Sequence, residues 1–182
     1  MAYAGEVVLP AKTREHVLIG LSATPRVLAL LSGPLNPESP VWELSLPGRF
    51  TLRETMAHLA DWDEVFMRRA KATLRREASV PDPDSGKLAI EKQYARLDPH
   101  DSIRRFARAR WDLVRFFKDL NDEQWGKVTT HPRHGAMSLE VQAVHALGHD
   151  GYHLDAITSM LALAGLAEAG LQESVSDQPG MN

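Results

Sequence analysis

The stretch SLEVQAVHALGHDGYHLDAITSMLALA, residues 138–164, decides the fold that we expect for this chain. Its apolar residues recur at helical spacing, its first residue is a good N-cap and a glycine follows its last, so it predicts one long helix. Within it, His145, His149 and His153 are spaced four residues apart. Residues at this spacing lie on one face of a helix, so the three imidazoles point the same way.

A single metal ion can use only two of these three histidines. The outer two are separated by about 12 Å along the helix axis, whereas a metal–imidazole bond is about 2.1 Å long. The coordinating pair is therefore either His149 with His153 or His145 with His149, and a further ligand has to come from another helix. His58, on the flank of an upstream apolar stripe, is the best candidate. Taken alone, however, such a histidine is more often a hydrogen-bonded, partly buried residue.

Three histidines leave at least one position open on zinc, nickel or iron, which is the pattern of a catalytic site. The chain contains no cysteine, so disulfides, cysteine-ligated zinc and a protein thiol nucleophile are excluded. If thiol chemistry takes place here, the sulfur has to come from a small molecule. Asp150 and Gly151 follow His149, so the segment is not the zincin motif.

Three further helices are expected, over residues 12–32, 51–78 and 99–120. Thr51 and Glu54 predict a capping box at the start of the second, and Pro25 predicts a kink or a new turn in the first. Residues 87–96 could add a short helix, and no segment is a convincing strand. Four helices with two longer connections predict an all-α protein, an antiparallel four-helix bundle. We expect one domain over residues 1–167 and a flexible tail over residues 168–182.

The helical pattern also predicts which side chains are buried. For the helix over residues 99–120 the expected buried stripe is Ile103, Phe106, Trp111 or Ala107, Val114, Phe117 and Leu120. Its arginines are expected on a solvated face. Asp61 and Asp63 are expected on the surface of the preceding helix, although one of them could instead accept a hydrogen bond from a metal-ligating histidine. His131 and His134 are expected as solvated loop histidines, although they could instead border the mouth of the site.

Composition restricts the partners. The formal net charge is −3, and 43% of the residues are hydrophobic, so no bulk attraction to nucleic acid or to an anionic membrane is expected. No apolar run approaches the roughly 20 residues that span a bilayer. The first residues lack the charged and apolar regions of a signal peptide, so we expect a cytoplasmic location.

Two segments resemble the DinB-like superfamily. Residues 50–62, FTLRETMAHLADW, are similar to its second-helix signature, and residues 144–153, VHALGHDGYH, are similar to its last-helix H-x-x-x-H block. The resemblance spans most of the chain, because the order and spacing of the four helices also agree. After His153, residues 154–157 read Leu-Asp-Ala-Ile where Arg-Gly-Gln and an aliphatic residue are usual, which affects the surroundings of the site and the substrate class.

The resemblance implies an up-down-down-up bundle, frequent homodimers and a metal site made by His58, His149 and His153, with His145 as a neighbour. Characterised relatives include metal-dependent transferases that use a small thiol such as bacillithiol, and mycothiol-dependent isomerases. The leading hypothesis is therefore a metal-dependent thiol S-transferase in detoxification or stress response, acting on a small thiol and an electrophile. The alternatives are a non-catalytic metal-binding stress protein, and a metal-dependent hydrolase with Asp150 or Asp61 as base.

Overall fold

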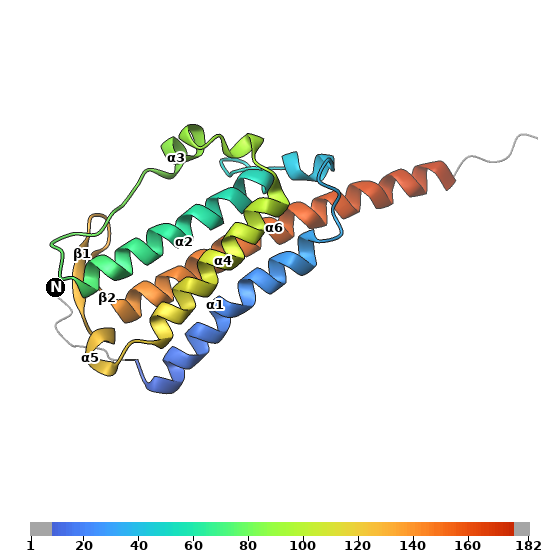
Figure 1. Cartoon of the computed structure of the whole chain (residues 1–182). Coiled ribbons are helices and arrows are strands. Elements are labelled where there is room, and N and C mark those ends of the chain that lie inside the picture. The colour runs from blue at the N-terminus through green and yellow to red at the C-terminus, as the bar shows by residue number, and fades with distance from the viewer. Residues whose placement is uncertain (1–8, 177–182) are drawn as a thin grey trace, which may run out of the picture.

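The computed structural model describes residues 9–176 and consists mainly of helices (Figure 1). Four long helices form the bundle: α1 (Ala11–Ser32), α2 (Leu52–Leu74), α4 (Pro99–Lys118) and α6 (Leu139–Ser176). The connections contain short elements: η1 (Pro40–Glu43), α3 (Ser85–Glu91), η2 (Tyr94–Arg96), α5 (Asp122–Trp125), β1 (Val128–His131) and β2 (Gly135–Ser138).

The four long helices follow the up-down-down-up order (Figure 1). Helices α1 and α6 run in one direction, and α2 and α4 run in the other. Helix α2 packs against α6, and α4 packs against α1. The most extensive contact is between α2 and α4. Because α2 and α4 are parallel neighbours, the chain has to run back along the whole length of the bundle between them. This long connection contains α3 and η2. The predicted all-α four-helix bundle is confirmed.

The predicted capping box starts α2. The Thr51 hydroxyl accepts a hydrogen bond from the Glu54 backbone N–H at 3.2 Å, and the Glu54 carboxylate accepts one from the Thr51 backbone N–H at 2.9 Å. Two of the four unsatisfied N–H groups at a helix start are usually covered in this way. The box sets the first residue of α2, and with it the face on which His58 lies.

A buried polar layer divides the hydrophobic core into two clusters. One cluster gathers around Leu21 and Leu113, and the other around Leu59 and Met160. Between them lie one side chain from each long helix: Thr24, Asp63, Arg110 and Asp150.

Arg110 is the centre of this layer and is only 1% exposed. Its Nε and Nη2 donate to the Asp63 carboxylate, both at 2.7 Å, and its Nη2 also donates to Asp150 at 2.8 Å. The Thr24 hydroxyl donates to Asp150 at 2.6 Å. Burial opposes the charge of Arg110, but the two carboxylates outweigh it and hold the pKa of the guanidinium above its ordinary value.

Pro25 lies inside α1 without ending it, since the helix is continuous from Ala11 to Ser32. Proline has no N–H to donate to the carbonyl four residues earlier. That carbonyl belongs to Leu21, and it accepts a hydrogen bond from Arg110 Nη1 at 3.1 Å. Of the two predicted effects of Pro25, a kink or a new turn, the new turn does not occur, and the proline frees an acceptor for the buried arginine.

Some predictions of burial are also wrong. Trp111 is 67% exposed, whereas Arg110, expected on a solvated face, is buried with Asp63. Asp61 is buried as well. The arginines of this helix were placed outside because the acidic partners of a buried arginine lie on other helices and cannot be recognised from one helix alone.

Several predicted local features differ from the structure, and α2 ends at Leu74, four residues before the predicted end at Ala78. Strands β1 and β2 pair as an antiparallel hairpin where a loop was expected, with His131 opposite Gly135 and a φ of +72° at that glycine. Helix α6 was expected to end at Ala164, but it continues through Gly165 to Ser176 and projects beyond the other helices (Figure 1). A glycine costs a helix only about 1 kcal/mol, and helix-forming residues follow it. Residues 177–182 of the predicted tail lie outside the described residues.

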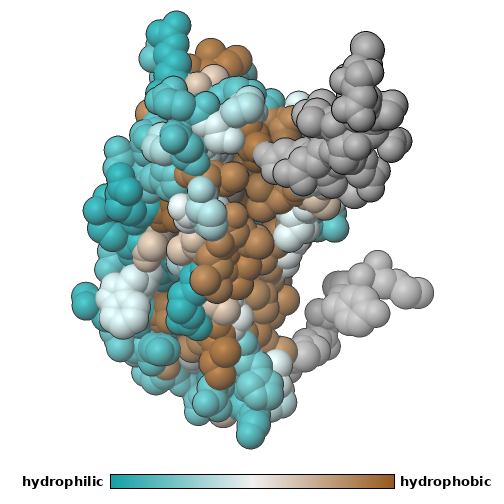
Figure 2. Space-filling model, turned by 90° about the vertical axis from the view of Figure 1, so that its right-hand side faces the viewer, coloured by the Kyte–Doolittle hydropathy of each residue, from teal (hydrophilic) through white to brown (hydrophobic). Residues whose placement is uncertain are grey.

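The end of the bundle towards which α1 and α6 run carries a hydrophobic band (Figure 2). Exposed apolar side chains of these two helices include Leu30 and Leu163. Among the described residues, no helix combines the length and the apolar character needed to cross a bilayer.

The buried layer makes a prediction about stability. Replacing Arg110 with methionine leaves Asp63 and Asp150 buried without a counter-charge, so the free energy of unfolding should fall by about 3–5 kcal/mol. Urea unfolding followed by circular dichroism measures this change. Arg104→Gln on the same helix removes only an exposed pair with Asp101, and should change stability by less than about 0.5 kcal/mol. A loss for Arg110→Met as small as that of the control would contradict the role of the layer.

Candidate metal centre

Two neighbouring helices supply the three predicted ligands. His149 and His153 lie one turn apart on α6, and His58 lies on α2, which packs against α6 in the opposite direction. Below them, Asp150 on α6 and Asp63 on α2 bind the same arginine. Because both aspartates bind Arg110, the relative position of α2 and α6 along the bundle axis is fixed. His58 and His149 therefore lie at the same height along that axis.

The imidazole nitrogens of the three histidines converge. The Nε2 of His149 lies 3.1 Å from the Nε2 of His58 and 3.2 Å from the Nε2 of His153. One ligand atom from each of the three lies within 4.8 Å of the other two. Two bonds of about 2.1 Å at a tetrahedral angle put ligand nitrogens about 3.4 Å apart. The two distances from His149 are thus close to the spacing that a tetrahedral cation with an open position requires.

The protonation of the three rings also suits a cation. Burial lowers the pKa of His58 to about 4 and that of His153 to about 3, and it lowers the pKa of His149 further. All three imidazoles are therefore neutral near pH 7, which is the form that ligates a metal. A neutral imidazole carries one proton, and with that proton on Nδ1 the Nε2 atom of each ring has a lone pair for a metal.

Aromatic rings hold the histidines in place. The Trp62 ring lies 4.7 Å from that of His58 and stacks on that of His149 at 6.0 Å, and the Phe50 ring lies 5.2 Å from that of His58. Phe66 meets His149 edge-on at 5.4 Å. These rings restrict rotation of the imidazoles and exclude water from their edges, which strengthens electrostatic interactions at the centre.

A cavity of about 770 Å³ opens over the three histidines. This volume is in the range of small-molecule sites. Its charged lining residues in the described part of the chain are Arg49, Arg69 and Arg133, and none of the lining side chains is a carboxylate. The cavity therefore favours an anionic ligand.

The other histidines divide into two groups. His145 lines the cavity, but it is not one of the converging ligands, so the structure favours His149 with His153 over His145 with His149. His134 is exposed and also lines the cavity, which supports the interpretation that it borders the mouth of the site. His131 was expected to be solvated but is only 1% exposed, because it ends β1 under the ring of His134, at 4.5 Å.

Neither aspartate considered as a catalytic base is free. Asp61 accepts hydrogen bonds from Tyr94 at 2.7 Å and from Arg105 at 2.6 Å, and lies 3.0 Å from the Lys92 ammonium. Burial raises the pKa of Asp61, but these partners outweigh it and hold the pKa below the usual value. Asp150 is bound to Arg110 and Thr24.

Two of the cavity arginines, Arg49 and Arg133, were not predicted from the sequence. Arg49 lies in the loop before α2, and Arg133 lies in the turn between β1 and β2. Neither segment has a periodic pattern that would place its side chains. A charged residue in such a loop is normally assigned to solvent, so no signal in the sequence identified them.

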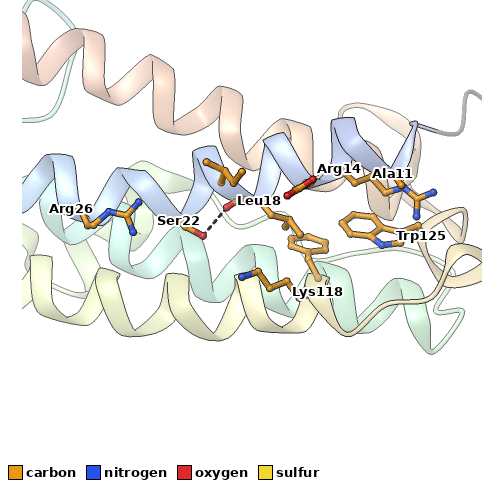
Figure 3. A pocket seen from close by; sticks show the side chains of 10 residues that line it. Ala11, Arg14, Leu18, Ser22, Arg26, Lys118 and Trp125 are labelled. Atoms are coloured by element: carbon orange, nitrogen blue, oxygen red, sulfur yellow. Dashed lines mark hydrogen bonds between the residues drawn. The ribbon is translucent and has the colours of Figure 1, made fainter.

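A second cavity, of about 530 Å³, lies between α1 and α4 (Figure 3). Arg26 and Lys118 lie at its rim, and Trp125 closes one end. The α1–α4 groove is on the opposite side of the bundle from the α2–α6 groove, and its lining in the described residues contains no histidine. It is separate from the metal centre.

The convergence of the three imidazole nitrogens predicts that the protein binds a metal ion through them. Replacing His58, His149 or His153 with alanine should weaken the binding of zinc or nickel by more than about 100-fold, because each removes a direct ligand. The metal bound per chain after dialysis, determined by mass spectrometry, measures this. His16→Ala, an exposed position on α1, is the control and should bind metal as the natural protein does. Full metal occupancy in both the His58 and the His149 variant would show that these histidines do not form a metal site.

Burial of the ligands also predicts a pH dependence. The pKa of His58 is about 4 in the folded chain and about 6.5 when unfolded, so between these values only the unfolded chain binds the proton. The stability of metal-free protein should therefore fall as the pH decreases through this window, by up to about 1.4 kcal/mol per pH unit for this group. Urea unfolding at several pH values measures the slope, which His58→Gln should reduce. An unchanged slope would mean that His58 is not kept neutral by burial.

The fold has a match among solved structures. YfiT from Bacillus subtilis, described as a probable metal-dependent hydrolase with an unusual four-helix bundle topology, superimposes with a TM-score of 0.77. The two chains are 20% identical, and the alignment covers 90% of this chain and 94% of YfiT. At this identity the likeness establishes the shared fold. No curated protein matches the chain.

The family model described as the DinB superfamily matches residues 21–157. This range includes α2 and the part of α6 that carries the histidines, so the match covers the site as well as most of the bundle. The chain belongs to the DinB superfamily.

Proposed function

We propose that the protein is a metal-dependent S-transferase, which joins a small thiol to a small electrophile. The observation that carries the proposal is the convergence of His58, His149 and His153 beneath a cavity whose described lining has arginines and no carboxylate. Such a cavity favours an anionic nucleophile over a neutral one. The chain has no cysteine, so the thiol is a separate molecule, and bacillithiol is a candidate.

The three imidazoles would hold a divalent cation, zinc, nickel or iron. Such a cation lowers the pKa of a thiol that binds it, so that the thiolate is present near neutral pH. The sulfur then forms a bond to the electrophilic carbon, the leaving group departs with its electron pair, and the thiol proton neutralises that group or passes to water.

The residues of the chain contribute binding and orientation to this reaction. Trp62 and Phe50 cover one side of the imidazoles and limit the access of water. The neutral ligands add no negative charge to the centre, so they do not repel a thiolate. Arg49, which has no acidic partner among the described residues, adds positive potential to the cavity, which favours the thiolate over the thiol.

The unusual segment after His153 does not close the site. Ile157 is buried in the core and Leu154 packs against the same cluster, while Asp155 is exposed. Only Ala156 lines the cavity, and its small side chain leaves room for a ligand. The departure from the usual family pattern is therefore compatible with an enzyme and does not itself favour the non-catalytic alternative.

A metal-dependent hydrolase is the second candidate, and the description of YfiT favours it. An open position on the cation would suit water as well as a thiol. The bound state of Asp61 and Asp150 weighs against it, because neither can take a proton from water without leaving its partners.

Thiol dependence separates the candidates. With zinc- or nickel-loaded protein and monochlorobimane as electrophile, conjugation of bacillithiol or cysteine should require both metal and thiol, and should be lost on chelation. His58→Ala should reduce kcat/KM by more than about 100-fold relative to the natural protein, and His16→Ala should not. Metal-dependent ester cleavage without thiol would favour the hydrolase, and metal that changes only the melting temperature would favour a non-catalytic protein.

We also propose that the protein is a cytoplasmic homodimer with a role in detoxification or stress response. Support for the dimer comes from the hydrophobic band in Figure 2 and from exposed apolar side chains on α1, such as Ile19 and Leu30. Light scattering measures the assembly: a mass of one chain at micromolar concentration would contradict it.

A further inference from the structure

Arg49 differs from the other two arginines of the cavity because it has no acidic partner. Arg133 is neutralised by Asp82, with Nε and Nη2 donating at 2.6 and 2.7 Å, and Arg69 donates to the same carboxylate at 3.0 Å. Within the described residues, the Arg49 side chain makes no hydrogen bond to an acceptor, and its Nη1 is fully buried without one. A buried donor without an acceptor is costly, so this nitrogen points to a missing ligand group.

The backbone and one aromatic ring hold Arg49 at the cavity. The φ of Gly48 is +71°, a conformation that glycine adopts without strain, and the Arg49 N–H donates to the Leu46 carbonyl at 3.0 Å. The resulting turn places the guanidinium carbon 3.8 Å from the centre of the Tyr152 ring. The cation–π contact restricts the guanidinium without using its N–H groups, so they stay available.

This guanidinium lies at the His153 end of the cavity. Tyr152 precedes His153 on α6, and both line the cavity with Arg49. Arg69 and Arg133, joined through Asp82, lie near His145, about two turns of α6 before His153.

We propose that Arg49, stacked on Tyr152, binds a carboxylate of the small molecule that enters the cavity. The assignment rests on the proposed function, in that the carboxylate belongs to the thiol whose sulfur is held at the histidines. A guanidinium presents two parallel N–H groups that match the two oxygens of a carboxylate. One carboxylate would compensate the single charge of Arg49 and supply the acceptor that Nη1 lacks.

Three probes test the assignment by calorimetric titration of zinc-loaded protein. N-acetylcysteine carries a thiol and a carboxylate, its primary amide keeps only the thiol, and N-acetylalanine keeps only the carboxylate. In the natural protein, N-acetylcysteine should bind about tenfold more tightly than its amide, as expected for a charge-assisted hydrogen bond in a partly open site. Arg49→Gln should abolish this preference, and Arg49→Lys, which keeps the charge but not the fork, should restore part of it.

The matched control is Arg133→Gln, at the neutralised arginine of the same cavity, which should keep the tenfold preference. Melting temperatures of the variants verify that each is folded. A preference that survives Arg49→Gln, or that disappears in Arg133→Gln alone, overturns the assignment.

N-acetylalanine separates this assignment from the proposed function. If it binds as tightly as N-acetylcysteine, the thiol contributes nothing and the transferase proposal fails. The effect of Arg49→Gln on the affinity for N-acetylalanine then still decides the role of Arg49: a loss of about tenfold supports it, and no loss overturns it.

Discussion

One buried arginine connects all four long helices of the bundle. Arg110 on α4 binds Asp63 on α2 and Asp150 on α6, and it also donates to a carbonyl of α1 that a proline has left without a partner. A charge in the core is tolerated only when its counter-charges and hydrogen bonds are nearly complete. The cluster is therefore a strong constraint on how the helices slide and rotate relative to one another.

The candidate metal centre depends on that constraint. Asp150 is adjacent in sequence to His149, and Asp63 follows His58 after little more than one turn of α2. When both aspartates bind the same guanidinium, the two histidines are brought to the same height in the α2–α6 groove. A shift of one turn in either helix would move a ligand by about 5.4 Å, far more than a metal–nitrogen bond can absorb.

Burial gives the site a particular electrostatic character. The aromatic rings around His58 and His149 keep both imidazoles neutral, so they are ready to ligate but contribute no negative charge. The cavity above carries guanidinium groups, of which two share the single carboxylate of Asp82, while Arg49 has no acidic partner among the described residues. This combination selects ligands by their negative charge.

The sequence by itself determined the helical class of the protein, the order of the four helices and the start of α2, because helical periodicity and the Thr51–Glu54 capping box are local patterns. It also identified His58, His149 and His153 as a candidate set, through an i, i+4 pair and a resemblance between motifs. The spacing alone could not choose between the two possible pairs on α6.

Only the tertiary structure decided which polar residues are buried, and which charges face the site. Whether Asp63 or Arg110 is inside depends on partners from other helices, and a single helical pattern does not contain that information. The same holds for the burial of His131 on a strand that was not expected, and for the placement of Arg49 by a turn at Gly48. Helical pattern is a property of neighbours in sequence, whereas charge compensation is a property of neighbours in space.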